Sequence, residues 1–146
     1  MESVSVRPAT VADCTILATL LGHFDDTATS PEQLATRMVA AADLITTFLA
    51  EMEGRVVGFA SLRLVPNLQW DVPFADLTDL YVAEPFRRRG VARALIAHVE
   101  AVAQAAGARE VVIMTGLGNA GAQATYHAAG YSDWAVALRK HLSETP

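Results

Sequence analysis

The sequence is poor in the features that mark secreted and membrane proteins, with one cysteine in 146 residues and no long apolar run. Cys14 has no second cysteine for an internal disulfide, which fits a reducing compartment. No apolar stretch reaches the ~18 residues that cross a bilayer, and the N-terminus lacks the basic and apolar regions of a signal peptide. We therefore expect a cytoplasmic protein with no membrane partner.

Positive charge is also scarce, because 16 acidic residues outweigh 11 Lys and Arg and leave a net charge of −5. A nucleic-acid-binding chain needs a basic surface, so we expect no nucleic-acid partner; an acidic protein attracts cationic ligands instead. No two of the four histidines have metal-ligand spacing, and we expect no metal. The apolar fraction of 52% excludes disorder, and the length predicts a single domain, 1–146.

The period of the apolar residues predicts a mixed set of helices and strands. The clearest segment is 91–106, where apolar residues recur at the i, i+3, i+4, i+7 spacing of a helix. A strand, this helix and the apolar run 110–115 form a parallel crossover, whereas Glu53-Gly54 joins two strands as an antiparallel hairpin. We predict an α/β (α+β) fold with a mixed, mostly antiparallel twisted sheet. The expected strands are 4–6, 46–52, 55–64, 75–82, 110–115 and 131–142; the expected helices are 10–22, 31–42, 91–106 and 119–130, with a polar loop at 23–29.

One turn has the composition of a phosphate-binding site. The strand that ends at Val82 leads into an arginine-rich turn and then the helix that starts near Val91. The first turn of a helix has unpaired N–H groups and a positive dipole end, where a pyrophosphate fits. Gly90 lets the backbone approach a ligand, and Ala92 is small enough to do the same. The ordinary alternative is a solvated basic turn. The arginines that would add charge are Arg87, Arg88, Arg89 and Arg93.

The pattern Arg-x-x-Gly-x-Ala at 87–92, after Asp-Leu-Tyr-Val, resembles the acetyl-CoA pyrophosphate loop of the GNAT N-acetyltransferases. Residues 119–131 resemble the family's Asn-x-x-Ala-x-x-x-Tyr-x-x-x-Gly-Phe segment, and the element order also matches. The resemblance implies the GNAT fold, with helices on both faces of the sheet, and an acetyl-CoA-dependent N-acetyltransferase. The sequence departs from the family at Arg88 and Arg89, where a glycine or a smaller residue is frequent.

The resemblance also implies roles for single residues. The backbone of Leu80 and Val82 would pair with the pantetheine arm of acetyl-CoA, and residues 87–93 would supply N–H groups to the pyrophosphate. Asn119 would touch the cofactor arm, and Tyr126 would lie near the thioester sulfur. The full set of expected cofactor-binding residues is Leu80, Tyr81, Val82, Arg87, Arg88, Arg89, Gly90, Val91, Ala92, Arg93, Asn119 and Tyr126.

The implied reaction is direct attack of an amine on the acetyl thioester, which needs a base and a proton donor. Tyr126 is the expected donor to the leaving thiolate. Some relatives have a glutamate base where this chain has Thr78, so the base is open: Asp79 is our choice, with Asp76 and His23 as alternatives. Asp79 could instead be a structural acid at a strand bulge.

The acceptor side is predicted from acidic and aromatic residues in two loops, which suit a small cationic amine such as a polyamine or an amino sugar. Solvated loops are the ordinary alternative. A protein N-acetyltransferase and a non-catalytic acyl-CoA-binding module are the other functions considered. An exposed edge on the last expected strand, 131–142, makes a homodimer plausible. The expected acceptor residues are His23, Phe24, Asp25, Asp26, Trp70, Asp71 and Asp76.

Overall fold

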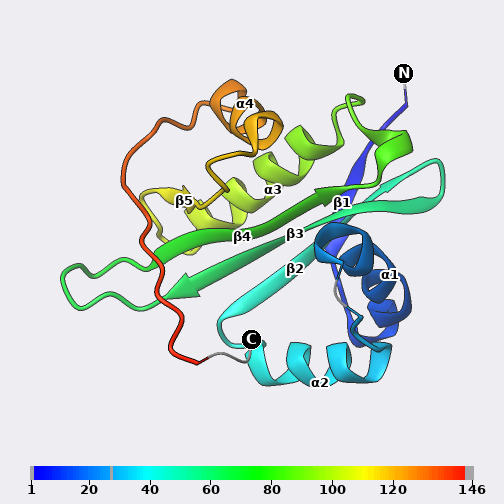
Figure 1. The fold of residues 1–146 in the computed structure, drawn as a ribbon, viewed down its shortest axis with the longest axis horizontal. Coiled ribbons are helices and arrows are strands. Elements are labelled where there is room, and N and C mark those ends of the chain that lie inside the picture. Colours follow the sequence, from blue (N-terminus) through cyan, green and yellow to red (C-terminus); the bar gives the residue numbers. More distant parts are fainter. Residues whose placement is uncertain (1, 27, 144–146) are drawn as a thin grey trace. The chain divides into compact units, whose positions relative to one another are not determined.

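The computed structural model describes residues 2–26 and 28–143, which form two compact units, Met1–Ile113 and Met114–Pro146 (Figure 1). The second unit contains helix α4 (Ala120–Ala128). Within the described residues, none of the helices has the length and apolar character needed to cross a membrane. The first unit contains β1 (Ser5–Pro8), a 3-10 turn (Val11–Asp13), α1 (Cys14–Asp25), α2 (Pro31–Ala41), β2 (Ile45–Met52), β3 (Arg55–Val65), β4 (Phe74–Val82), a second 3-10 turn (Glu84–Phe86), α3 (Val91–Ala105) and β5 (Val111–Ile113).

The five strands form one sheet in the order β1-β2-β3-β4-β5. The first three pairings are antiparallel, and β4 pairs with β5 in parallel, so the mixed, mostly antiparallel sheet is confirmed. The β2–β3 hairpin turns at Glu53 and Gly54, which both have the positive φ that a two-residue turn of this kind requires. The hairpin predicted from Glu53-Gly54 is therefore present.

Helices cover both faces of this sheet. Phe59 of β3 packs with Leu17 and Leu20 on the α1 side. Its neighbour Gly58 faces the other way, because a Cβ atom there would lie 3.4 Å from the Leu95 side chain of α3. That Cβ atom would also lie 2.6 Å from the Tyr81 carbonyl oxygen, so a larger residue at Gly58 would clash with the backbone of β4 and push β3 and β4 apart.

The β3–β4 ladder contains a bulge at Thr78. Leu62 pairs with Leu77 and Ser61 pairs with Asp79, so Thr78 has no partner across the ladder. The extra residue places Leu77 and Leu80 on the same face, toward α3, although they are three positions apart. Asp79 is thereby kept on the α1 face.

Helix α1 is longer than the sequence suggested, which makes the predicted loop at 23–29 wrong in its first half. The helix passes through Gly22 and ends at Asp25, with Asp26 in the left-handed conformation as its C-cap. Glycine inside a helix costs about 1 kcal/mol. The ring of Phe24 offsets this cost, since it packs edge-on against Phe59, with 5.8 Å between ring centroids.

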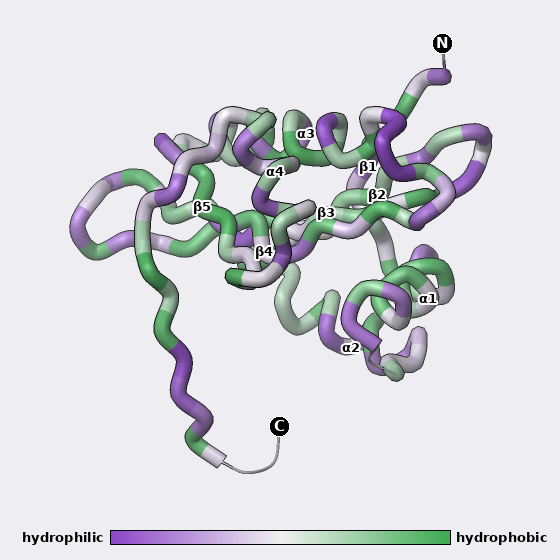
Figure 2. The backbone as a smooth tube through the Cα atoms, turned by 45° about the horizontal axis from the view of Figure 1, so that its top comes forward, coloured by the Kyte–Doolittle hydropathy of each residue, from purple (hydrophilic) through white to green (hydrophobic). Residues whose placement is uncertain are grey.

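The end of the chain also differs from the prediction, because 131–142 is not a strand. Figure 2 shows it as an extended trace in which apolar positions precede polar ones. Apolar alternation favours a strand, but a strand is stable only when it pairs with others in a sheet. β5 is also shorter than predicted, with three residues, Val111–Ile113, instead of 110–115. The exposed strand edge that suggested a homodimer is therefore absent at 131–142, and the homodimer stays a prediction.

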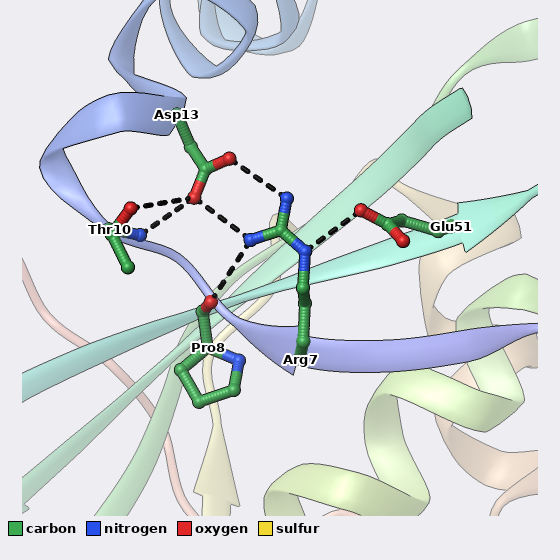
Figure 3. A network of polar contacts seen from close by, with 5 residues as sticks. All are labelled: Arg7, Pro8, Thr10, Asp13 and Glu51. Carbon is green, nitrogen blue, oxygen red and sulfur yellow. Dashed lines mark hydrogen bonds and ion pairs between the residues drawn. The ribbon is translucent and has the colours of Figure 1, made fainter. Parts of the chain in front are cut away.

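A polar network ties β1 to the start of α1 (Figure 3). The Arg7 guanidinium donates two hydrogen bonds of 2.9 Å to Asp13, and its Nε atom donates one of 2.8 Å to Glu51 on β2. The Thr10 backbone N–H also donates to Asp13, which completes a capping box. Mainly through the hydrogen bonds of Arg7, the pKa of Asp13 falls to about 2.

We expect the Arg7→Met variant to lose about 1 kcal/mol of stability at pH 7, since Arg7 is partly exposed and the pair is screened by solvent. Because the pKa of Asp13 is lower in the native state, this carboxyl stays ionised in the folded protein between about pH 4 and pH 2, where it takes up a proton in the unfolded chain. The contribution is therefore present above about pH 4 and lost as the pH falls toward 2. Urea unfolding at pH 7, 4.5 and 3 measures it. The same destabilisation of the variant at pH 7 and pH 3 would contradict the assignment, and Arg55→Met is the exposed-arginine control.

Candidate functional site

The β4–α3 turn has the backbone of an anion site. Gly90 is the N-cap of α3 with φ 84°, and the Ala94 N–H makes the first helical bond to the Gly90 carbonyl at 3.0 Å. The N–H groups of residues 91–93 therefore point out of the helix end. Arg88 has φ 61°, a left-handed conformation that glycine adopts at lower cost. The turn thus keeps the glycine-type backbone at the position where the sequence has an arginine.

The neighbouring edge of β4 is open. The pairing of β4 with β5 ends at Leu77 and Ile113, and no described strand pairs with residues 78–82 on that side. The Ala83 N–H donates to the Val57 carbonyl of β3, so by alternation Leu80 and Val82 direct their N–H and C=O groups to the open edge. The Val82 carbonyl accepts from the Arg87 side chain there, which leaves the Val82 N–H and the backbone groups of Leu80 for an extended ligand. The backbone groups of Tyr81 face β3, so only Leu80 and Val82 could pair with an extended ligand at the open edge.

The four arginines of the motif have different positions. Arg87 folds back, donating a hydrogen bond of 2.8 Å from Nε to the Val82 carbonyl, and lies 5.6 Å from the Tyr81 ring centroid. Arg89 forms ion pairs with Glu2 and Glu53. The side chains of Arg88 and Arg93 are exposed and make no hydrogen bond or ion pair within the described part of the chain. Arg88 and Arg93 are thus the two arginines of the turn whose charged groups are not already bound to other described residues.

The α1 face of the sheet carries the candidate base in a polar row that crosses three strands. The Thr47 and Ser61 hydroxyls lie 2.9 Å apart, and the Thr78 hydroxyl donates to the Asp79 carboxylate at 3.1 Å. Asp79 is half-buried, so its carboxylate is positioned by the bulge and partly shielded from water. Asp79 therefore lies next to a strand bulge, as a structural acid would, and its carboxylate could still accept a proton as a base.

Asp76 is placed differently from Asp79. Its carboxylate forms an ion pair of 2.8 Å with Arg63 across the β3–β4 ladder. A carboxylate neutralised in this way is a weaker candidate for a base or for a cation site. Sequence reasoning missed Arg63, because its partner depends on the strand register.

The remaining acceptor residues lie in two places. His23, Phe24 and Asp25 are in the last turn of α1, followed by Asp26 at its C-cap. The Phe24 ring contacts Tyr81 as well as Phe59, which joins this helix end to β4. Trp70 and Asp71 are exposed in the loop between β3 and β4. The structure brings together the α1 end and β4, and it leaves the loop pair at the surface.

The second unit holds Asn119 and Tyr126. Asn119 is the N-cap of α4, since its Oδ1 atom accepts a hydrogen bond of 3.1 Å from the Ala122 N–H, as predicted. Tyr126 lies on α4 and packs edge-on against Tyr131, with ring centroids 6.2 Å apart. Their roles toward the cofactor stay predictions.

Two further chemistries are tested by the described residues. Cys14 is buried in α1, and burial raises the pKa of its thiol, which disfavours the reactive thiolate. A covalent route through Cys14 is therefore unfavourable. Within the described ranges, no group of three His, Cys, Asp or Glu side chains could hold a metal ion.

Comparison with known proteins gives one family. The model of the acetyltransferase (GNAT) family matches residues 16–131, which extend across both compact units. An aminoglycoside N(6′)-acetyltransferase type 1 of Stenotrophomonas maltophilia is 32% identical over 133 residues, covering 88% of this chain and 86% of that protein. A phosphinothricin N-acetyltransferase of Streptomyces viridochromogenes is 26% identical over 140 residues, covering 88% and 74%. The solved structure of aminoglycoside N-acetyltransferase AAC(6′)-Iy in complex with CoA has the same fold, with a TM-score of 0.83 at 22% identity, over 98% of this chain and 97% of that chain.

Proposed function

Because the chain belongs to the GNAT family of acetyltransferases and is an N-acetyltransferase, we propose that it transfers the acetyl group of acetyl-CoA to a primary amine of a small cationic acceptor. The observation that carries the proposal is the β4–α3 turn beside the open edge of β4. An extended arm can pair with this edge, and a pyrophosphate can bind at the helix end that follows it. Acetyl-CoA has both parts in that order.

Binding of the cofactor divides between backbone and side chains. The N–H groups of residues 91–93 would bind the pyrophosphate, and Gly90 leaves the approach open, since a Cβ atom there would have no neighbour within 4 Å. Arg88 and Arg93 would add positive charge beside the phosphates. Leu80 and Val82 would pair with the pantetheine arm. Support from a relative comes from AAC(6′)-Iy, whose structure contains CoA.

In the proposed reaction the amine nitrogen attacks the thioester carbonyl carbon, a C–N bond forms and the C–S bond breaks. Asp79, held by the Thr78 hydroxyl, would take the amine proton through water. A backbone N–H at Leu80 or Val82 would donate to the oxyanion. Tyr126 would give a proton to the leaving thiolate, so that CoA leaves as the thiol.

The acceptor is proposed to be cationic because carboxylates lie at the end of α1 and on β4, with a further one in the surface loop before β4. Asp25 and Asp26 end α1, Asp71 lies in the loop before β4, and Asp79 lies on the strand. Aminoglycosides, which the first relative acetylates by its name, carry several amines and fit this charge. A panel of amines assayed by release of the CoA thiol tests the proposal. Cofactor binding without thiol release on any amine would indicate a binding module instead.

We expect Asp71→Asn to raise the KM for a cationic amine about fivefold, since one exposed charge pair is worth about 1 kcal/mol. The effect should shrink as salt is added, because screening weakens exposed pairs. The KM for acetyl-CoA should stay unchanged. Steady-state kinetics at two salt concentrations measure both constants, with Asp43→Asn as the charge-matched control. A wild-type preference for neutral or acidic acceptors would contradict the cationic acceptor and leave the acetyltransferase standing.

A further inference from the structure

We propose that Arg89 is a positioning residue: it binds no phosphate, and it holds the β4–α3 turn in its cofactor-binding shape by fastening it to the β2–β3 hairpin. The inference rests on the proposed function of the turn as the acetyl-CoA site. It reverses the role that the arginine-rich motif suggests for this side chain.

The contacts of Arg89 lead away from the helix end. Its Nη2 atom donates to the carboxylates of Glu53, on the β2–β3 hairpin turn, and of Glu2, near the N-terminus. Its guanidinium also lies over the Phe86 ring, 5.3 Å from the centroid. The three partners come from three segments, and Figure 1 shows the hairpin turn, the N-terminal segment and the β4–α3 turn at the same end of the sheet.

The charge balance opposes a role in phosphate binding. One guanidinium faces two carboxylates, so the cluster is net negative and would repel a pyrophosphate that came close. The hydrogen bond from Arg89 is the main cause that lowers the pKa of Glu53, and the hydrogen bonds to Glu2 and Glu53 raise the pKa of Arg89. Both groups therefore remain charged at neutral pH.

The turn needs an outside support. Arg88 and Gly90, on either side of Arg89, are both left-handed, and a left-handed non-glycine residue is strained. A strained turn keeps its conformation only when surrounding contacts fix it. Glu53 is also left-handed, but the two-residue hairpin turn that carries it is closed by the ladder pair Met52–Arg55. Arg89 thus links the left-handed backbone of the β4–α3 turn to the paired β2–β3 hairpin.

The test compares Arg89→Met, Glu53→Gln and the double variant. We expect each single change to raise the KM for acetyl-CoA about fivefold to tenfold, with kcat within twofold of the wild type. The double variant should be no worse than the more affected single variant, because both changes break the same contact. Arg89→Lys should restore part of the affinity. Arg109→Met and Glu32→Gln remove the same charges elsewhere and should change neither constant.

The sign of the Glu53→Gln effect decides between the two roles. If Arg89 were a phosphate ligand held back by Glu53, this variant would free it and lower the KM for acetyl-CoA, which would overturn the proposal. Unchanged KM in both single variants would also overturn it. If Gly90→Asp leaves CoA binding intact as well, the turn is not the cofactor site and the proposed function fails with it. Thermal unfolding of each variant separates loss of fold from loss of cofactor affinity.

Discussion

Replacement of Gly90 by aspartate is expected to weaken CoA binding about 100-fold. The new carboxylate would stand at the helix end where we propose that the pyrophosphate binds, and two like charges at 4 Å cost about 1 kcal/mol in water and about 4 kcal/mol near a protein surface. The φ of 84° adds strain for any residue with a Cβ atom. Isothermal titration with CoA measures the loss of affinity.

Gly90→Ala is the matched control for this substitution. It introduces the same backbone strain without the charge, and the Cβ atom meets no neighbour within 4 Å. We expect a much smaller loss of CoA affinity for Gly90→Ala than for Gly90→Asp. Equal losses in the two variants would assign the effect to the backbone alone. Unchanged affinity in a folded Gly90→Asp protein would remove the phosphate-binding role of the turn.

The second large effect is expected at Tyr126. The Tyr126→Phe variant keeps the ring and its packing against Tyr131 but removes the hydroxyl that would protonate the leaving thiolate. General acid catalysis is worth about 10²-fold or more, so we expect kcat to fall by that factor. Affinity for CoA should change little, because the lost interaction belongs to the transition state.

Tyr131→Phe provides the control, since it alters the ring partner of Tyr126 and not the expected acid. Steady-state rates with acetyl-CoA and a reactive amine compare the two variants. A near-normal kcat for Tyr126→Phe would mean that water or another group protonates the thiolate. The acetyltransferase activity would then stand with a different proton donor.

Local patterns predicted the parts of the fold that depend on neighbours in sequence. The helices expected at 31–42 and 91–106 are present within a residue or so of those bounds, because capping residues such as Ser30 and apolar stripes are short-range features.

The features that the sequence patterns did not predict depend on contacts between residues far apart in the chain. Arg89 and Glu53 are 36 positions apart, and nothing near either residue indicates that they pair. The ion pair of Arg63 with Asp76 depends on the strand register, which the bulge alters. Phe24 extends α1 through contacts with two strands that lie far along the chain. The sequence therefore predicted most helices and strands, but it could not predict which side chains pair over long distances in the chain.

The bulge at Thr78 interrupts the regular β3–β4 ladder beside the open edge of β4. Without Thr78, the residues from Leu77 to Leu80 would alternate normally, and both apolar faces would be kept. A bulge bends its strand and increases the local twist, and this one directly follows the last β4–β5 pair, Leu77 with Ile113. The backbone groups of β4 beyond the bulge have no strand partner on the β5 side among the described residues. If acetyl-CoA binds there as we propose, its extended arm would form the hydrogen bonds that a further stretch of parallel strand would otherwise have made.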